Sequence, residues 1–428
     1  MARNRLAPGR RTLAVFTVVL TGLVAGSLAI GRVRTEAPTA APAAAVAPPA
    51  PADAAVALQA ALGYHSILAA DMMRSRLRGD EDLARAAETA VARNTDDMRE
   101  LVAALLGAAR GEQFRLLWSA HVAALANYSR GVADEDNGAR DAARATLSTF
   151  EGDLAGFLSD GSQGRLPREA AKAAAYLHVD HLMQQADAFA AGDYARADQL
   201  YREGYAHTFA LGETIATALL GPRAAAALRA PAWRLRSQLT LLLGEHVALA
   251  VAATRAGVTN APDFAAAGEA VNANTRDLAG AIDALFGAAA AQRFQSLWAD
   301  HVEQLVAYTG GVASGDRARR EDAVGRLTGF EQQFAAFLSD ATGGRLPVTA
   351  LARTLLMHDQ MLMAQVDAYV AKQYEQAHES AYATYGHMGE VARDLAEAFG
   401  GTVGARLPTG GSQTGLGGMA GAHAHGSR

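Results

Sequence analysis

Cysteine is absent from this chain of 428 residues. Its absence excludes disulfides, thiolate metal sites and cysteine nucleophiles. Aromatic residues make up only 6% of the chain and strand-like patterns are nearly missing, whereas half of the residues are hydrophobic and alanine is abundant. This composition favours helices that pack closely through small side chains.

Acidic residues outnumber basic ones beyond the start of the chain. Six of the 39 basic residues precede the first acidic residue, so the rest is more acidic than the whole-chain net charge of −5. An acidic body argues against nucleic acid and anionic lipid surfaces as partners. No Ser/His/Asp arrangement, phosphate-binding loop or carboxylate pair stands out, and we therefore expect no enzyme.

One long uncharged apolar run is present, at residues 12–31. Its 20 residues are about the length that crosses a bilayer as a helix. Four arginines precede the run and two follow it, which predicts a single membrane anchor with a cytoplasmic amino terminus. A cleaved signal peptide is the alternative, because Ser27-Leu28-Ala29 resembles a cleavage site. In both cases the bulk of the chain is expected outside the cytoplasm.

An internal duplication spans most of the remaining chain. The stretch FRLLWSAHVAALANYSRGVA at 114–133 returns 180 residues later as FQSLWADHVEQLVAYTGGVA at 294–313. Glycines that end helices and aspartates that begin them divide each copy into about six helical segments. Short turns make neighbouring helices antiparallel. In the first copy the segments are expected near 54–77, 81–106, 111–131, 138–159, 168–190 and 194–219.

The predicted fold is all-α, with two tandem up-and-down helical bundles behind the anchor. Proline-rich and glycine-rich stretches set the boundaries, because they cannot pack a core. The predicted parts are a cytoplasmic basic segment (1–11), an anchor or signal segment (12–31), a Pro/Ala-rich linker (32–53), bundle 1 (54–220), a linker (221–231), bundle 2 (232–402) and a disordered Gly/His tail (403–428).

Eight of the 12 histidines recur in matched pairs. Within a copy each lies near the middle of a different helix and on its apolar stripe, so the imidazoles of one copy are expected to meet. Asp97 and Asp277 are expected nearby, as further ligands or as acceptors that orient a ring. The predicted metal ligands are therefore His65, His121, His178, His207, His246, His301, His358, His387, Asp97 and Asp277.

Physical chemistry favours a ligand bound between these rings. A buried imidazole without partners leaves a donor and an acceptor unsatisfied, at ~1 to 3 kcal/mol each, whereas one divalent ion satisfies several nitrogens. Nitrogen and carboxylate ligands suit zinc, copper or iron. Soft ligands that favour copper occur in His178-x-x-His181-x-Met183 and in its counterpart His358-x-x-Met361-x-Met363. Haem held by two histidines is less favoured, and a core network without a ligand is the competing interpretation.

Three motifs carry a resemblance: Asn-Thr-x-Asp at 94–97, Phe-x-x-x-Trp-x-x-His at 114–121 and Gly-Arg-Leu-Pro at 164–167. Together they resemble a helical repeat of bacterial cell-envelope proteins, some of which carry a domain labelled copper amine oxidase N-terminal-like. The resemblance covers about residues 54–400 and implies an envelope location and copper, without oxidase activity. We expect an extracytoplasmic metal-binding protein for capture, buffering or sensing, with a structural or protein-interaction module as the alternative.

Overall fold

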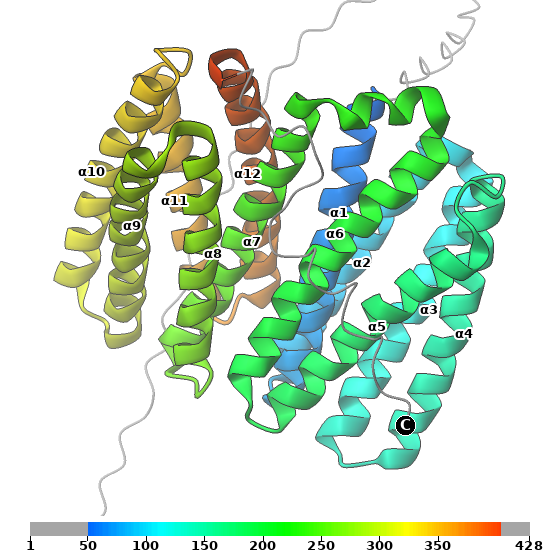
Figure 1. The fold of residues 1–428 in the computed structure, drawn as a ribbon. Coiled ribbons are helices and arrows are strands. Elements are labelled where there is room, and N and C mark those ends of the chain that lie inside the picture. Colours follow the sequence, from blue (N-terminus) through cyan, green and yellow to red (C-terminus); the bar gives the residue numbers. More distant parts are fainter. Residues whose placement is uncertain (1–49, 404–428) are drawn as a thin grey trace, which may run out of the picture. The chain divides into compact units, whose positions relative to one another are not determined.

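The computed structural model describes residues 50–403, which form helices joined by short turns (Figure 1). No β-strand occurs within this range, so the all-α prediction is confirmed. The first six helices are α1 (Pro51–Leu77), α2 (Glu81–Leu106), α3 (Ala108–Ala133), α4 (Asn137–Gly161), α5 (Arg168–Ala190) and α6 (Tyr194–Ala225). After the 3-10 helix η1 (Ala227–Arg229) come α7 (Pro231–Thr259), α8 (Phe264–Phe286), α9 (Ala288–Ser314), α10 (Arg317–Ala341), α11 (Val348–Val370) and α12 (Tyr374–Val403).

Local sequence chemistry sets the helix ends. The side chains of Asp80, Asp136 and Asp193 each accept a hydrogen bond from a backbone N–H three residues later, as N-caps do. Gly107 separates α2 from α3 with φ of 91°, a conformation that glycine adopts without steric cost. The six segments predicted for the first copy match α1–α6 to within three residues, except that α6 continues to Ala225.

Helices α1 and α7 are central to the two halves of the described chain. Helix α1 packs against α2, α3, α5 and α6, and α7 packs in the same way against α8, α9, α11 and α12. Figure 1 shows α1, in blue, beside α6. Because four helices surround each central helix, their inner side chains converge on it.

The two halves also contact each other. The hydroxyl of Tyr205 lies 3.1 Å from that of Tyr385, its counterpart in the other copy. These hydroxyls donate to the carbonyl oxygens of Leu241 and Ala60, which are also matched positions. Each half therefore makes the same contact with the other, and the described residues belong to one compact unit.

The predicted linkers and terminal segments are only partly covered by the described residues. Residues 221–231, expected as a linker, contain the end of α6 and η1, with a break at Gly221, where φ is 79°. The segments predicted at 1–11 and 12–31, most of 32–53 and the tail from 404 lie outside the described residues. Within 50–403, α7 alone is long and apolar enough to cross a membrane, but 78% of its most apolar stretch is buried in the protein, as in a core helix.

Candidate metal centre

Each half of the protein brings three of the repeated histidines together. The first cluster is His65 on α1, His121 on α3 and His178 on α5, with ring centroids 5.2 to 5.5 Å apart. The second cluster is His246 on α7, His301 on α9 and His358 on α11, with ring centroids 5.6 to 5.9 Å apart. Each of these histidines is at most 3% exposed.

Aromatic side chains hold the rings in place. The ring of His121 stacks on Phe150 of α4 with centroids 4.2 Å apart, and His301 stacks on Phe330 of α10 at 4.7 Å. Both phenylalanines are almost fully buried. Close aromatic packing of this kind excludes water and restricts ring rotation.

Hydrogen bonds fix the proton positions of His178 in the first cluster. Thr208 Oγ1 donates its hydrogen to Gly204 O at 2.7 Å, so it accepts from His178 Nδ1, which lies 3.1 Å away. In the neutral ring Nε2 is then the acceptor, and it receives the proton of His121 Nε2 at 3.2 Å. Nε2 of His178 therefore directs a lone pair toward the cluster centre, while Thr208 orients the ring as an outer partner of a metal ligand does.

His65 is held differently. Trp118 Nε1–H donates to His65 Nδ1 at 3.0 Å, so the neutral ring carries its proton on Nε2. That nitrogen is buried without a partner among the described residues, as is Nδ1 of His121. His65 must lose the tryptophan hydrogen bond before its Nε2 can bind an ion.

The second cluster has no such hydrogen bonds. Within residues 50–403, none of its six ring nitrogens has a hydrogen-bond partner. Met388 stands at the position of Thr208, and Nε1 of Trp298 is also unpartnered although its ring lies 4.7 Å from that of His246. In all three imidazoles, both ring nitrogens are therefore free of hydrogen bonds to the described residues.

A buried carboxyl group lies beside this second cluster. Asp359 Oδ1 is 3.4 Å from His301 Nδ1, without the alignment of a hydrogen bond, and the Asp359 carboxyl group hydrogen-bonds to the side chain of Glu331. Burial raises the pKa of Asp359 well above its ordinary value, and the carboxylate of Glu331 raises it further. The first copy has Val179 at the matched position. The second centre is thus three imidazoles with a carboxyl group.

Burial also keeps the imidazoles neutral. It lowers the pKa of His65 to about 3 and that of His246 to about 4. The other four cluster histidines have pKa values well below the ordinary value, because of burial and then of the neighbouring imidazoles. At neutral pH the rings therefore carry lone pairs, which is the form that binds metals.

An apolar cavity of about 40 Å³ adjoins the second cluster. His301 and His358 line it, together with Phe294, Trp298 and Phe334. Its size allows about three water molecules. His301 and His358 belong to its wall, so the second centre has space beside it as well as free ligands.

Two predicted ligands, His207 and His387, lie outside the clusters. Nε2 of His207 faces Ala174 O at 3.0 Å, and Nε2 of His387 faces Thr354 O at 3.2 Å. They belong to α6 and α12, and at these positions the side chain faces the adjacent helix α5 or α11 instead of the centre. The expected meeting of four imidazoles in each copy is therefore corrected to three.

Asp97 and Asp277 also lie outside the clusters. Asp97 accepts a hydrogen bond from the hydroxyl of Tyr382, and Asp277 accepts one from Arg202 Nη2 at 2.7 Å. Tyr382 and Arg202 are matched positions, so each aspartate binds the opposite half. Both aspartates are exposed, and their carboxylates stay hydrated at the junction between the halves instead of entering the buried centre.

Three residues of the centres were not assigned from the sequence: Asp359, Trp118 as a donor and Thr208. Asp359 follows His358 directly, and a carboxylate where the first copy has valine was an available signal. No sequence signal pairs Trp118 with His65, since α1 and α3 meet only in the folded chain.

Comparisons with known proteins add no relative, because no protein family, curated protein or solved structure matches this chain. The geometry of the two clusters is therefore the basis for assigning a function.

Proposed function

We propose that this protein binds transition-metal ions at two buried tri-histidine centres, one in each half, and that the second centre binds more tightly. One observation carries the proposal. Seven buried polar atoms of the second centre lack a described partner: both ring nitrogens of His246, His301 and His358, and Trp298 Nε1.

The energetic cost of that arrangement is large. Each buried unsatisfied polar group costs about 1–3 kcal/mol, so seven of them cost on the order of 10 kcal/mol. A whole domain is stable by only about 5–15 kcal/mol. A single ion relieves three nitrogens at once, and Asp359, which lies outside the tri-histidine set, is placed beside His301 as an outer partner.

The spacing of the ligand atoms fits an ion. In each cluster one ligand atom from every histidine lies within 4.8 Å of the others. Bonds of about 2.0–2.1 Å in a tetrahedral site separate two nitrogens by about 3.3 Å, close to the 3.2 Å between His121 Nε2 and His178 Nε2. Imidazole ligands suit zinc, copper or iron. Rings this close favour an ion over haem, whose plane would have to pass between them.

The wider context of the proposal comes from the sequence. We propose two tandem up-and-down bundles on a Pro/Ala-rich stalk, held in the cell membrane by the helix predicted at 12–31, with the bulk of the chain extracytoplasmic. Binding for capture, buffering or sensing suits such a site better than catalysis, because the centres are buried and no catalytic set accompanies them. The cell-envelope resemblance supports the same location.

A structural module without a ligand is the second candidate. The hydrogen bonds of His65 and His178 favour it for the first cluster, because these rings are already partly satisfied by Trp118 and Thr208. The second cluster has no comparable bonds. The two candidates therefore differ most sharply in what they predict for His246, His301 and His358.

Metal analysis of the purified full-length chain tests the proposal. The metal-depleted protein is equilibrated with zinc, copper or iron, and bound metal and thermal stability are measured. We expect tight binding of one ion, a second ion bound more weakly, and a higher Tm. His301→Ala should abolish the tight site and His121→Ala the weak one.

His207→Ala and His387→Ala are the matched controls, since these histidines are repeated but lie outside the clusters. They should retain both ions. A chain that takes up none of the three metals, and whose Tm none of them changes, supports the structural module instead.

A further inference from the structure

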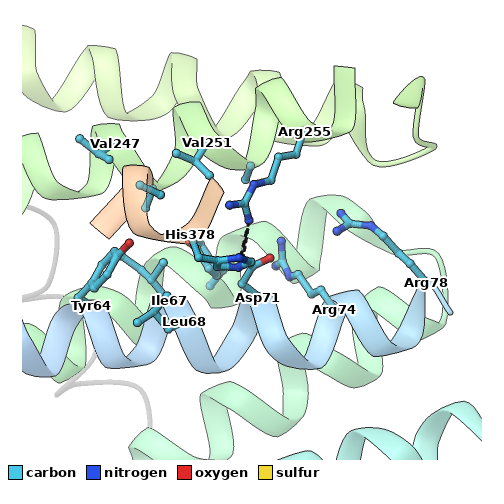
Figure 2. Close-up of a pocket in the computed structure, with 14 residues that line it drawn as sticks. Tyr64, Ile67, Leu68, Asp71, Arg74, Arg78, Val247, Val251, Arg255 and His378 are labelled. Carbon is cyan, nitrogen blue, oxygen red and sulfur yellow. Dashed lines mark hydrogen bonds and ion pairs between the residues drawn. The ribbon is translucent and has the colours of Figure 1, made fainter. Parts of the chain in front are cut away.

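A second polar pocket lies between the two halves, where α1, α7 and α12 meet. Figure 2 shows Asp71, Arg74 and Arg78 rising from α1 toward Arg255 of α7 and His378 of α12. Asp71 Oδ2 accepts from Arg255 Nη1 at 2.7 Å and from His378 Nε2 at 2.9 Å. The pocket reaches solvent, because the side chains of Asp71 and Arg78 are 23% and 30% exposed.

Comparison of the two copies explains why Arg255 lacks a full set of partners in this pocket. In the first copy, Arg74 donates to Gln185, to Asp198 and to the carbonyl of Ala197, so its guanidinium is satisfied. Arg255 is the counterpart of Arg74, but His378 stands where the first copy has Asp198. Arg255 therefore reaches across to Asp71, and its Nη2 is left buried without a partner within residues 50–403.

His378 adds a second positive charge. Its Nδ1 faces Tyr374 O at 2.8 Å, and its Nε2 lies closer to the Asp71 carboxylate, at 2.9 Å, than to Arg255 Nη1, at 3.4 Å. Because a carbonyl and a carboxylate only accept, both ring nitrogens donate and the ring is an imidazolium. Arg255 and His378 thus share the single negative charge of Asp71.

The other arginines of the pocket are already neutralised. Arg74 pairs with Asp198, and Arg78 pairs with Asp263. The ionic groups that line the pocket, together with these two aspartates, therefore carry one net positive charge when Arg255, His378 and Asp71 are included.

Two tyrosine hydroxyls complete the set of free donors. Tyr64 and Tyr201 line the pocket and are 4% and 8% exposed. Neither hydroxyl has a hydrogen-bond partner in the described part of the chain, and neither oxygen is among the fully buried unpartnered atoms, so the water of the pocket reaches both. In contrast, Tyr205 and Tyr385, which lie outside this pocket, have fully bonded hydroxyls.

We propose that this pocket binds a short-chain monocarboxylate, whose carboxylate accepts from Arg255 Nη2 and from the hydroxyls of Tyr64 and Tyr201. One net positive charge matches a monoanion, whereas a dianion such as phosphate meets the fixed charge of Asp71. The cavity of about 40 Å³ suits a ligand of a few heavy atoms. Ile67, Leu68 and Val251 supply an apolar wall for the alkyl end.

Binding of acetate and propionate to the full-length chain tests this proposal by calorimetry and by thermal shift, with chloride and phosphate at equal ionic strength. We expect propionate to bind and to raise Tm in proportion to its concentration, and phosphate and chloride to have no comparable effect. Tyr64→Phe and Tyr201→Phe should each weaken binding about tenfold, because each removes a hydrogen bond to a charged group. Neither should lower the Tm of the ligand-free protein, since no protein hydrogen bond is lost.

Tyr205→Phe is the matched control, because it removes a hydroxyl that is bonded within the protein but does not line the pocket. It should lower Tm and leave propionate affinity unchanged. His301→Ala should also leave that affinity unchanged, which separates this pocket from the metal centres. Equal binding of chloride or phosphate, or wild-type affinity in both pocket variants, overturns the proposal.

Discussion

Asp359 lies beside His301, with Oδ1 3.4 Å from Nδ1, at the position that Val179 occupies in the first copy. This difference places a carboxyl group against only one of the two histidine clusters. The Asp359 carboxyl group also hydrogen-bonds to the buried side chain of Glu331. The two centres are therefore chemically distinct, and the residues at this matched position can be exchanged by substitution.

Asp359→Val should destabilise the metal-free protein and weaken metal binding at the second centre. Valine has nearly the volume of aspartate, so no cavity opens, but the change removes the hydrogen bond to the buried Glu331, and we expect a cost of about 1–3 kcal/mol. Val179→Asp places a carboxyl group at the matched apolar position and should cost a similar amount. Urea denaturation of the metal-depleted chain measures both. Unchanged stability in Asp359→Val would mean that the carboxyl group makes no hydrogen bond inside the protein.

Thr208 and Met388 offer a second exchange. Thr208→Val removes the acceptor of the His178 Nδ1 proton, which should cost about 1–3 kcal/mol and reduce metal affinity at the first centre about 10–100-fold. Met388→Thr adds a hydroxyl at the matched position and should raise affinity at the second centre. Calorimetric titration of each variant with zinc gives the affinities. Unchanged affinity in Thr208→Val would show that His178 is not a ligand.

Trp118 and Trp298 form a matched pair in which only one indole N–H has a partner. Trp118→Phe removes the hydrogen bond that the indole N–H donates to His65 Nδ1, whereas Trp298→Phe breaks no hydrogen bond. Both lose the same ring volume, so Trp118→Phe should be about 1–3 kcal/mol more costly in urea denaturation of the metal-depleted protein. It should also raise metal affinity at the first centre, because His65 can then move its proton to Nδ1. Equal stability losses would contradict the assigned tautomer.

The sequence predicts the helices and the meeting of the rings well, because both depend on local periodicity. His121 shares a helical face with Phe114 and Trp118, and that face has to point inward. The same stripe is more than 100° wide, so periodicity does not separate a position that faces the centre from one that faces a neighbouring helix. His207 is of the second kind. The site of Asp97 at the contact between the halves depends on packing that no single helix encodes.

Acid should destabilise the metal-free protein through the cluster histidines. Their pKa values fall from an ordinary 6.5 to about 3 for His65 and about 4 for His246, so the unfolded chain binds more protons than the folded one over that range. Stability is therefore fully present above pH 6.5 and falls below it, by about 1.4 kcal/mol per pH unit for each buried histidine. Asp359 has the opposite sign, because its raised pKa favours the folded state at low pH and costs stability as pH rises.

Urea midpoints of the metal-depleted chain from pH 7.5 to 5 measure this slope. His246→Asn should flatten it by about one proton, whatever it does to the absolute stability at neutral pH. Excess zinc should move the loss of stability to lower pH, since an ion and protons compete for the same nitrogens. His387→Asn keeps the six cluster histidines and serves as the comparison. A slope that is the same in His246→Asn and the wild type would show that this ring is already protonated in the folded protein, and a protonated ring has no place in a metal centre.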